Sequence, residues 1–431
     1  MFTDKTFCTL PWSHIQINTS GNFKVCCFTG DPAQPEGSTA REHGVGKDDN
    51  GAVMNVMTHS LEEAMNSTIH KELRLYQSED KRHPVCRMCW DKEDAGVESH
   101  RQKMNTMHDQ DDGYILRRHA SSRMSSDGTI NNFPVFLDIR FGNLCNAKCI
   151  MCEPLYSSLW FEDTKEIYGT DEFHVGADTY KVYQENGVYK SNLPKWWESE
   201  QFWKDFEKIA PRISELYITG GEPMLVPKHA DMLDMLIATG HSKKIKLSYD
   251  TNLLAINEKV VNKFQHFRDV VIAVSSDDIE DRFQYIRYPS NWKKLQNNIQ
   301  LLQKYNVKIK SISLCVGIYS LYSLMRMVPY YNSLGFYDFR QRILNSPVMF
   351  DMKWLPRQAK LDAINAYENS NIGQKNWQMT VGYLYNNLDV PENPQMLHRF
   401  VERMDKFDKL RKLDWKNTFP EIADIMKNYI K

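Results

Sequence analysis

The stretch LDIRFGNLCNAKCIMCEP, residues 137–154, decides the fold of this 431-residue chain. It begins as a short apolar run of the kind that forms a strand, and it breaks at Gly142. Cys145, Cys149 and Cys152 follow at C-x3-C-x2-C spacing, so we expect them in a loop after the carboxyl end of that strand. In a barrel of alternating strands and helices, the loops at that end carry the catalytic residues.

Three cysteines at this spacing are typical of a metal cluster with an incomplete set of protein ligands. Three thiolates leave one iron of a [4Fe–4S] cluster without a protein ligand, and that iron is open to another molecule. A structural zinc ion takes a closed set of four ligands, so zinc would require a distant fourth residue. Three reduced cysteines without metal are the remaining alternative.

Short apolar runs alternate with amphipathic, helical stretches through the middle of the chain. The predicted strands are 134–141, 213–221, 244–252, 269–276, 307–319 and 336–344. Such alternation is typical of parallel β/α units. We therefore predict an α/β fold, a partial (β/α)6 barrel of TIM type.

The barrel is expected over residues 133–345, with regions of different character on either side. A cysteine-containing domain precedes it at 1–110, followed by a polar linker at 111–132. A long insertion at 155–210 contains four tryptophans, Trp160, Trp196, Trp197 and Trp203, which are more typical of a local core than of a cavity cap. Residues 346–431 show helical spacing of apolar residues, and we expect helices packed on the barrel.

Composition excludes several classes of protein. The chain has 54 Lys and Arg against 55 Asp and Glu, which gives no electrostatic argument for nucleic acid or an anionic membrane as partner. No apolar run approaches the ~18 residues of a membrane span. The sequence begins without a secretory signal, and its nine cysteines are an odd number, so disulfides are not expected. We expect a soluble, cytoplasmic protein.

The cysteine loop resembles the signature of the radical S-adenosylmethionine (SAM) superfamily. Cys145-Asn-Ala-Lys-Cys149-Ile-Met151-Cys152 matches its CX3CXφC pattern, with Met151 at the hydrophobic place. The second predicted strand ends in a sequence that looks like the family's GGEP motif. The resemblance implies that this motif receives the amino group of SAM, through Gly220, Gly221, Glu222 and Pro223.

Later strands end in further pieces of the same pattern. Asn252 closes an Asp-Thr-Asn sequence similar to the family's Thr-Asn pair, and Ser275 and Asp277 resemble its V-S-x-D stretch. The resemblance implies that Ser275 contacts the ribose of SAM and that Arg287 contacts its carboxylate. It covers about residues 134–345. Each piece alone is typical of a turn, a helix cap or a surface charge, so their joint order carries the resemblance.

The activity implied by this resemblance is radical chemistry. SAM would chelate the open iron of the [4Fe–4S] cluster, and one electron would cleave SAM to a 5′-deoxyadenosyl radical that abstracts a substrate hydrogen. The cofactor carries such chemistry, and the protein supplies binding and orientation. The implied partners are a substrate and a one-electron donor such as flavodoxin or ferredoxin.

A second set of cysteines lies before the predicted barrel. Cys8 and Cys26 are separated as C-x12-G-x4-C, and Cys86 and Cys89 follow as C-x2-C. This resembles the SPASM and twitch domains that hold auxiliary iron–sulfur clusters, and it implies one auxiliary [4Fe–4S] cluster. Cys27 is an alternative ligand to Cys26. A structural zinc ion on four cysteines is the alternative metal. In the familiar cases this domain follows the barrel.

Three functions remain open from the sequence. The first is an oxidoreductase that modifies a peptide or protein by radical chemistry. The second is a dehydrogenase or epimerase that acts on a small molecule or a peptide, for which Cys315 on the fifth predicted strand is a candidate hydrogen donor. The third is a non-enzymatic iron–sulfur or zinc protein, which the intact SAM motifs disfavour. We predict the first.

Overall fold

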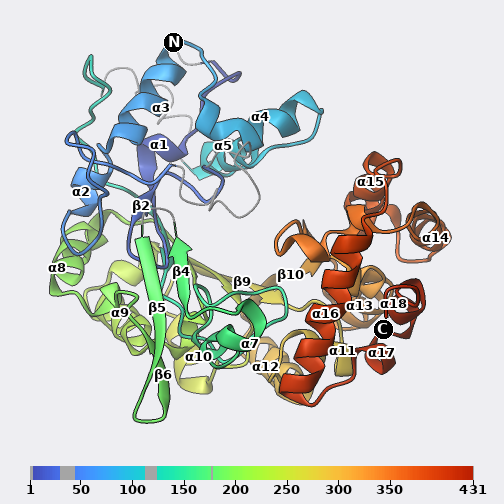
Figure 1. The fold of residues 1–431 in the computed structure, drawn as a ribbon. Coiled ribbons are helices and arrows are strands. Elements are labelled where there is room, and N and C mark those ends of the chain that lie inside the picture. The colour runs from blue at the N-terminus through green and yellow to red at the C-terminus, as the bar shows by residue number, and fades with distance from the viewer. Residues whose placement is uncertain (1–2, 30–43, 112–123, 176–177, 431) are drawn as a thin grey trace. The chain divides into compact units, whose positions relative to one another are not determined.

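The computed structural model describes residues 3–29, 44–111, 124–175 and 178–430. Most of the linker predicted at 111–132 lies outside these ranges. Figure 1 shows its helices and strands, coloured from the N-terminus to the C-terminus. The chain divides into two compact units. The first contains residues 1–143, 172–248 and 265–269, and the second contains 144–171, 249–264 and 270–431.

The main sheet has eight strands in the order β11-β10-β9-β8-β7-β3-β1-β2. Six of these follow one another in chain order, one inside each predicted run: β3 (Phe136–Arg140), β7 (Glu215–Thr219), β8 (Lys246–Thr251), β9 (Asp269–Ser275), β10 (Lys308–Val316) and β11 (Phe339–Ile343). The pairs β3–β7, β9–β10 and β10–β11 are parallel. The predicted α/β class with a TIM-type barrel core is confirmed.

The N-terminal region adds two strands to this sheet, which the sequence did not predict. β1 (His14–Ile17) pairs in parallel with β3, and β2 (Phe23–Lys24) pairs antiparallel with β1. All four residues of β1 are buried. Its polar Gln16 is satisfied because its Nε2 donates to Asp138 Oδ2 at 2.8 Å.

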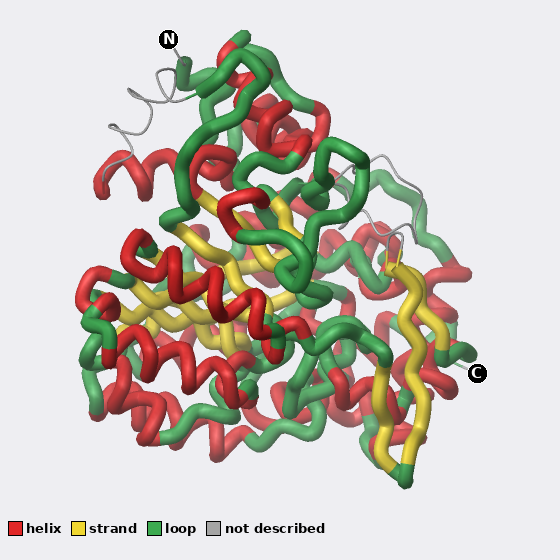
Figure 2. The backbone as a smooth tube through the Cα atoms, turned by 90° about the vertical axis from the view of Figure 1, so that its left-hand side faces the viewer, coloured by secondary structure: helices red, strands yellow, loops and turns green. Residues whose placement is uncertain are grey.

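The first unit also contains most of the N-terminal helices and a separate antiparallel sheet. Its helices are α1 (Leu10–Ser13), α2 (Leu61–Ala64), α3 (Thr68–Ser78), α4 (Arg87–Asp94), α5 (His100–Asp111), α8 (Glu200–Ile209) and α9 (Pro227–Ala238). The separate sheet consists of β4 (Glu172–Val175), β5 (Asp178–Glu185) and β6 (Val188–Ser191). The hairpin of β5 and β6 is the long yellow hairpin that projects downward in Figure 2.

The helices of the second unit include the whole C-terminal region, as predicted. They are α7 (Thr164–Tyr168), α10 (Glu258–Phe264), α11 (Glu280–Ile286), α12 (Trp292–Lys304), α13 (Ser323–Ser333), α14 (Arg357–Glu368), α15 (Gln378–Asn386), α16 (Pro394–Arg411), α17 (Trp415–Thr418) and α18 (Pro420–Ile425). α16 presents Phe407 to the buried Trp160 ring at 5.7 Å, so the helical region packs on the start of the insertion.

Two of the four insertion tryptophans are fully buried, and neither lies in a core made by the insertion alone. Trp196 stacks on Phe141 with ring centroids 5.6 Å apart, and its Nε1 donates to Thr19 O at 3.2 Å. Trp203 is half-buried and donates to Trp197 O. Among the described residues, no helix combines the length and apolar character that crossing a bilayer requires.

Candidate functional site

The loop that carries Cys145, Cys149 and Cys152 is hydrogen-bonded to the end of α11 and to the segment after it. Lys148 N donates to Tyr288 O at 2.6 Å, and Ile150 N donates to Ile286 O at 2.9 Å. Cys149 is buried and the other two thiols are half-buried. Burial raises the pKa of Cys152 well above its ordinary value, and the nearby thiols of Cys149 and Cys145 raise it further. The three thiols are therefore gathered, and metal binding has to displace their protons.

Two nitrogen donors point at sulfur atoms of this loop. Asn252 Nδ2 lies 3.9 Å from Cys145 Sγ and 2.7 Å from Asn146 Oδ1. Arg287 Nη1 lies 3.9 Å from Cys149 Sγ. Both residues were predicted to belong to the cofactor site, and both are buried. Donors at this distance stabilise thiolate over thiol, because hydrogen bonds to the charged form favour that form.

Asp277 connects Arg287 to the fifth barrel strand, β10. The Asp277 Oδ2 atom forms an ion pair with Arg287 Nε at 2.8 Å, at an angle that does not make a hydrogen bond. The Asp277 Oδ1 atom accepts a hydrogen bond from the backbone N of Cys315 at 2.7 Å. Burial raises the pKa of Asp277, and Arg287 opposes that rise. Burial also raises the pKa of Cys315 to about 12. The structure thus brings Asp277, Arg287, Cys315 and Cys149 together.

Ser275 and Met151 occupy less specific positions. Ser275 ends β9, is half-buried and lies in register with Ser313 of β10. Met151 is half-buried between Cys149 and Cys152. Neither residue has a contact in the structure that assigns it to a ligand, so their predicted roles stay predictions.

The Gly-Gly-Glu-Pro motif lies in the first unit, directly after β7. Gly220 has φ +125°, and a Cβ there would lie 2.9 Å from Phe141 N, so only glycine fits. Gly221 N donates to Gly142 O at 3.0 Å. Glu222 is almost fully buried, its Oε1 lies 3.4 Å from Met224 N, and Pro223 begins a short 3-10 turn.

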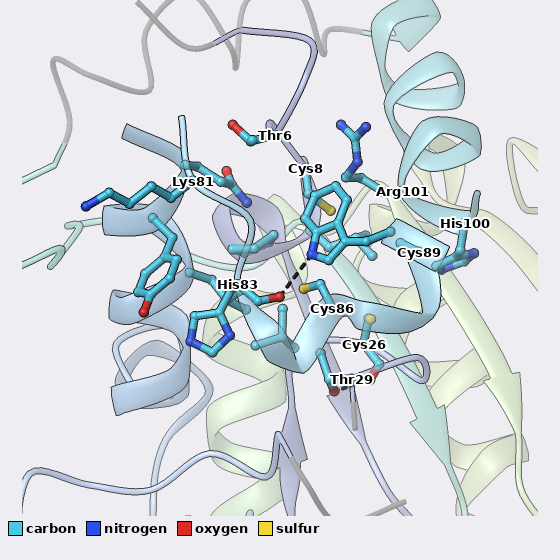
Figure 3. A pocket seen from close by; sticks show the side chains of 17 residues that line it. Thr6, Cys8, Cys26, Thr29, Lys81, His83, Cys86, Cys89, His100 and Arg101 are labelled. Atoms are coloured by element: carbon cyan, nitrogen blue, oxygen red, sulfur yellow. Dashed lines mark hydrogen bonds between the residues drawn. The ribbon is translucent and has the colours of Figure 1, made fainter. Parts of the chain in front are cut away.

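Four cysteines of the N-terminal region line one pocket (Figure 3). They are Cys8, Cys26, Cys86 and Cys89. Cys27 is exposed and does not line the pocket, whereas Cys26 is buried and does. The geometry therefore favours Cys26 over Cys27 as the ligand. Burial raises the pKa of Cys26 well above its ordinary value, and the other cysteines raise it further. Burial raises the pKa of Cys8 to about 12.

These cysteines fit a multi-iron group. None of the nine cysteines, all within the described ranges, forms a disulfide. Within those ranges, no three His, Cys, Asp or Glu side chains converge tightly enough to hold a single metal ion. An iron–sulfur cluster does not require that convergence, because each thiolate binds a different iron.

An acidic–basic pair supports the four-cysteine pocket from one side. Arg101 Nη2 lies 2.6 Å from Glu93 Oε2, and Ser99 Oγ donates to Glu93 Oε1 at 2.5 Å. Arg101 Nη1 also donates to Phe7 O at 2.6 Å, next to Cys8. The guanidinium thus holds the chain that leads into Cys8. Glu93, Ser99 and Arg101 follow the Cys-x2-Cys pair closely in sequence, which is the signal that points to them.

A second buried network was not predicted. Asp163 Oδ1 lies 2.8 Å from Lys148 Nζ, and Asp163 Oδ2 lies 3.2 Å from Arg411 Nη2. All three side chains are buried. Lys148 belongs to the cysteine loop, so this carboxylate joins the loop to α16. Arg411 lies 248 positions from Asp163 in the chain, and no local pattern could have paired them.

Two family models match the chain. The radical SAM superfamily model matches residues 139–321. The chain contains a radical SAM domain. A second model, an iron–sulfur cluster-binding domain, matches residues 8–90, ahead of the radical SAM domain. These matches confirm the predicted resemblance to the radical SAM superfamily. They also confirm the predicted SAM and iron–sulfur cofactors and the position of the auxiliary domain before the barrel.

The chain also shows low-level similarity to solved structures. The comparison with curated proteins yields no match. Native anSMEcpe with bound AdoMet and the Kp18Cys peptide is 15% identical with a TM-score of 0.36, over 62% of this chain and 66% of that one. SuiB of Streptococcus suis bound to the precursor peptide SuiA is 14% identical with a TM-score of 0.35, over 81% and 71%. Likeness at this level does not indicate a substrate.

Proposed function

We propose that this protein is a radical SAM enzyme that cleaves SAM reductively and oxidatively modifies a peptide or protein. The observation that carries the proposal is the cysteine loop with Asn252 and Arg287 each 3.9 Å from one of its sulfurs, inside the matched domain. When bound to a cluster that three cysteines ligate, SAM supplies a carbon radical able to abstract hydrogen. The resemblance implies that the Gly-Gly-Glu-Pro motif, Ser275 and Arg287 bind SAM.

The chain's residues have separate tasks in this proposal. Cys145, Cys149 and Cys152 would ligate the cluster, and the buried ion pair of Asp277 holds Arg287 toward Cys149. A guanidinium that is fixed by a carboxylate offers its remaining N–H groups in a constant direction, which suits the carboxylate of SAM. The Gly-Gly-Glu-Pro turn offers backbone groups and a buried carboxylate for the amino group of SAM.

Oxidation is favoured by the four-cysteine pocket. A cluster that Cys8, Cys26, Cys86 and Cys89 all ligate has no open iron for substrate, so the chemistry it supplies is electron transfer. A substrate that gives one hydrogen atom to the SAM-derived radical, and then loses one electron and one proton, would be oxidised by two electrons overall with SAM as the oxidant, as in a dehydrogenation or a new cross-link. We expect the first electron to come from a flavodoxin or a ferredoxin, and we retain a peptide as substrate because auxiliary-cluster enzymes often modify peptides.

Epimerisation is the second candidate function, because Cys315 lies at the carboxyl end of β10. Its backbone N donates to Asp277, the partner of Arg287, and this contact supports a position of Cys315 near the proposed cofactor site. A thiol there has a hydrogen atom to return to a substrate radical, and the product would keep its oxidation state. The substrate in that case is a peptide or a small molecule.

The test is anaerobic reconstitution with iron and sulfide, followed by SAM and dithionite. The wild-type protein should release 5′-deoxyadenosine, and Glu222→Ala and Ser275→Ala should weaken SAM binding without changing iron content. Glu198→Ala is the control, because that side chain is 60% exposed. Variants that bind SAM as well as the wild type would refute the assigned residues, and absence of cleavage by the wild type would refute the function.

Mass spectrometry of candidate peptides separates the two outcomes. Oxidation removes two mass units and does not depend on Cys315. Epimerisation in deuterated water adds one deuterium and is lost in Cys315→Ala. A redox-neutral product made by Cys315→Ala would contradict both versions.

A further inference from the structure

Two arginines on the last barrel strand share one face of the sheet. Arg340 and Arg342 alternate with Gln341, which points the other way. Gln341 Nε2 donates to Asn376 O at 2.9 Å, and its Oε1 accepts from Thr380 of α15 at 2.7 Å. The two arginines therefore lie on the face opposite the covering helix.

That face is concave. Arg340 Nη1 lies 3.2 Å from Asp250 Oδ1, and Arg342 Nη2 lies 3.7 Å from Asp250 Oδ2. Asp250 belongs to β8, and β9 and β10 lie between β8 and β11. In a flat sheet β8 and β11 would be about 14 Å apart, three strand spacings. The contacts require the sheet to curl, so these side chains meet across the inner face of the barrel strands.

The exposure of the three charged groups differs. The Asp250 side chain is 14% exposed, whereas Arg340 is 43% and Arg342 is 67% exposed. The carboxylate is covered, and the two guanidinium groups around it are accessible. Asp250 also shows that a carboxylate fits between them. An arginine presents its five N–H donors in a planar fork, a geometry that matches a carboxylate.

The pair adjoins the proposed reaction site through the strand register. Arg342 lies opposite Cys315 of β10, and Arg340 lies opposite Ser313. The Ser313 hydroxyl has no hydrogen-bond partner among the residues that the structure describes. Cys315 N in turn donates to Asp277, which holds Arg287 beside Cys149. The arginines are thus one strand away from residues around the cysteine loop.

We propose that Arg340 and Arg342 bind a carboxylate of the substrate on the inner face of the barrel, and that the substrate is therefore acidic. This inference rests on the proposed function, since it names the substrate class of the same site. The carboxylate has three sources that share this chemistry: an acidic side chain of a peptide, the C-terminus of a peptide, or a small organic acid.

Binding of defined probes to the full-length reconstituted protein tests the proposal. The probes are labelled decapeptide pools with blocked ends and one central Glu, the same pools with Gln, and the Gln pools with a free C-terminus. Unlabelled glutarate serves as a competitor. We expect at least one carboxylate probe to bind about fivefold or more tightly than the blocked Gln pool, because exposed charged hydrogen bonds are worth about 1 kcal/mol.

The variants assign that preference to the two arginines. R340Q/R342Q should abolish it, R340K/R342K should retain part of it, and D250N should strengthen it by removing the competing carboxylate. Arg357→Gln is the matched control, because Arg357 is also an exposed arginine paired with an aspartate. It is the first residue of α14, its side chain is 60% exposed, and its Nε lies 3.5 Å from Asp389 Oδ1. It should bind every probe like the wild type. Circular dichroism and iron content check that each variant is folded.

The outcomes are distinct. A preference for the Glu pool, the free C-terminus or glutarate that R340Q/R342Q abolishes supports the site and identifies the source of the carboxylate. Equal binding of all probes by the wild type, or a preference that survives in folded R340Q/R342Q, overturns it. If the wild type releases 5′-deoxyadenosine without any such preference, the site fails and the proposed function stands. If it prefers carboxylates but cleaves no SAM, the proposed function fails.

Discussion

Replacing Asp163 by Asn should loosen the cysteine loop. The substitution keeps the shape of the side chain and removes its charge. The asparagine would not neutralise the charges of Lys148, 2.8 Å away, and Arg411, 3.2 Å away. The side chains of these two residues are 9% and 0% exposed. Removing one partner of a buried ion pair costs about 3–5 kcal/mol. Lys148 keeps the exposed Glu162 at 3.2 Å, so we expect the lower end, about 3 kcal/mol.

Amide hydrogen exchange measures this loss where it arises. The amides of Lys148 and Ile150 are hydrogen-bonded to Tyr288 O and Ile286 O, and they report opening of the loop. A loss of about 3 kcal/mol corresponds to about 100-fold faster exchange at these amides. Asp424→Asn is the control, because Asp424 is 78% exposed and its pair with Lys427 is on the surface. Exchange in Asp163→Asn within threefold of the wild type would refute this account of the loop.

Three further predictions concern other parts of the chain. Reconstituted wild-type protein should contain about eight irons, and each of Cys8→Ser, Cys26→Ser, Cys86→Ser and Cys89→Ser should lower this toward four, whereas Cys27→Ser should not; equal losses for Cys26 and Cys27 would contradict the pocket. Gly142→Ala should reduce folded protein and iron content, because the new Cβ would lie 1.9 Å from the Trp197 ring at a φ of +58°; normal yield would show that Trp197 moves freely. Burial lowers the pKa of His70 to about 3, so the unfolded chain gains a proton below pH 6.5 that the folded chain does not, and stability should fall by up to about 5 kcal/mol between pH 6.5 and 3. Acid unfolding followed by tryptophan fluorescence should show a shallower pH dependence in His70→Gln than in the control His266→Gln, whose side chain is exposed.

The barrel strands and the cysteine loop were predictable because their signals are local. Each predicted run contains one strand of the main sheet, and C-x3-C-x2-C lies within eight residues. β1 was not predictable, because HIQI is only four residues long and its partner strand begins more than a hundred residues later. Spacing also could not decide between Cys26 and Cys27, because the side-chain directions of adjacent residues depend on the backbone after β2.

Contacts between distant parts of the chain were the other gap. Arg411 meets Asp163, and Arg340 meets Asp250, through side chains that project from separate elements. An isolated Arg in a sequence is most often a solvated surface charge. The curvature of the sheet and the packing of α16 determine these contacts, and neither has a sequence pattern of its own.

The pairing of β1 with β3 has a consequence for biosynthesis. His14 is matched with Phe136, so 122 residues must be translated after His14 before its neighbour exists. At about 5–20 residues per second, β1 waits roughly 6–24 seconds on the ribosome for that strand. The cysteines at 8, 26, 86 and 89 have all been made by then. A cluster inserted early would therefore enter a nascent chain in which β1 has no strand at the edge that β3 later occupies. A truncation between residues 90 and 134 would leave β1 and β3 on different fragments.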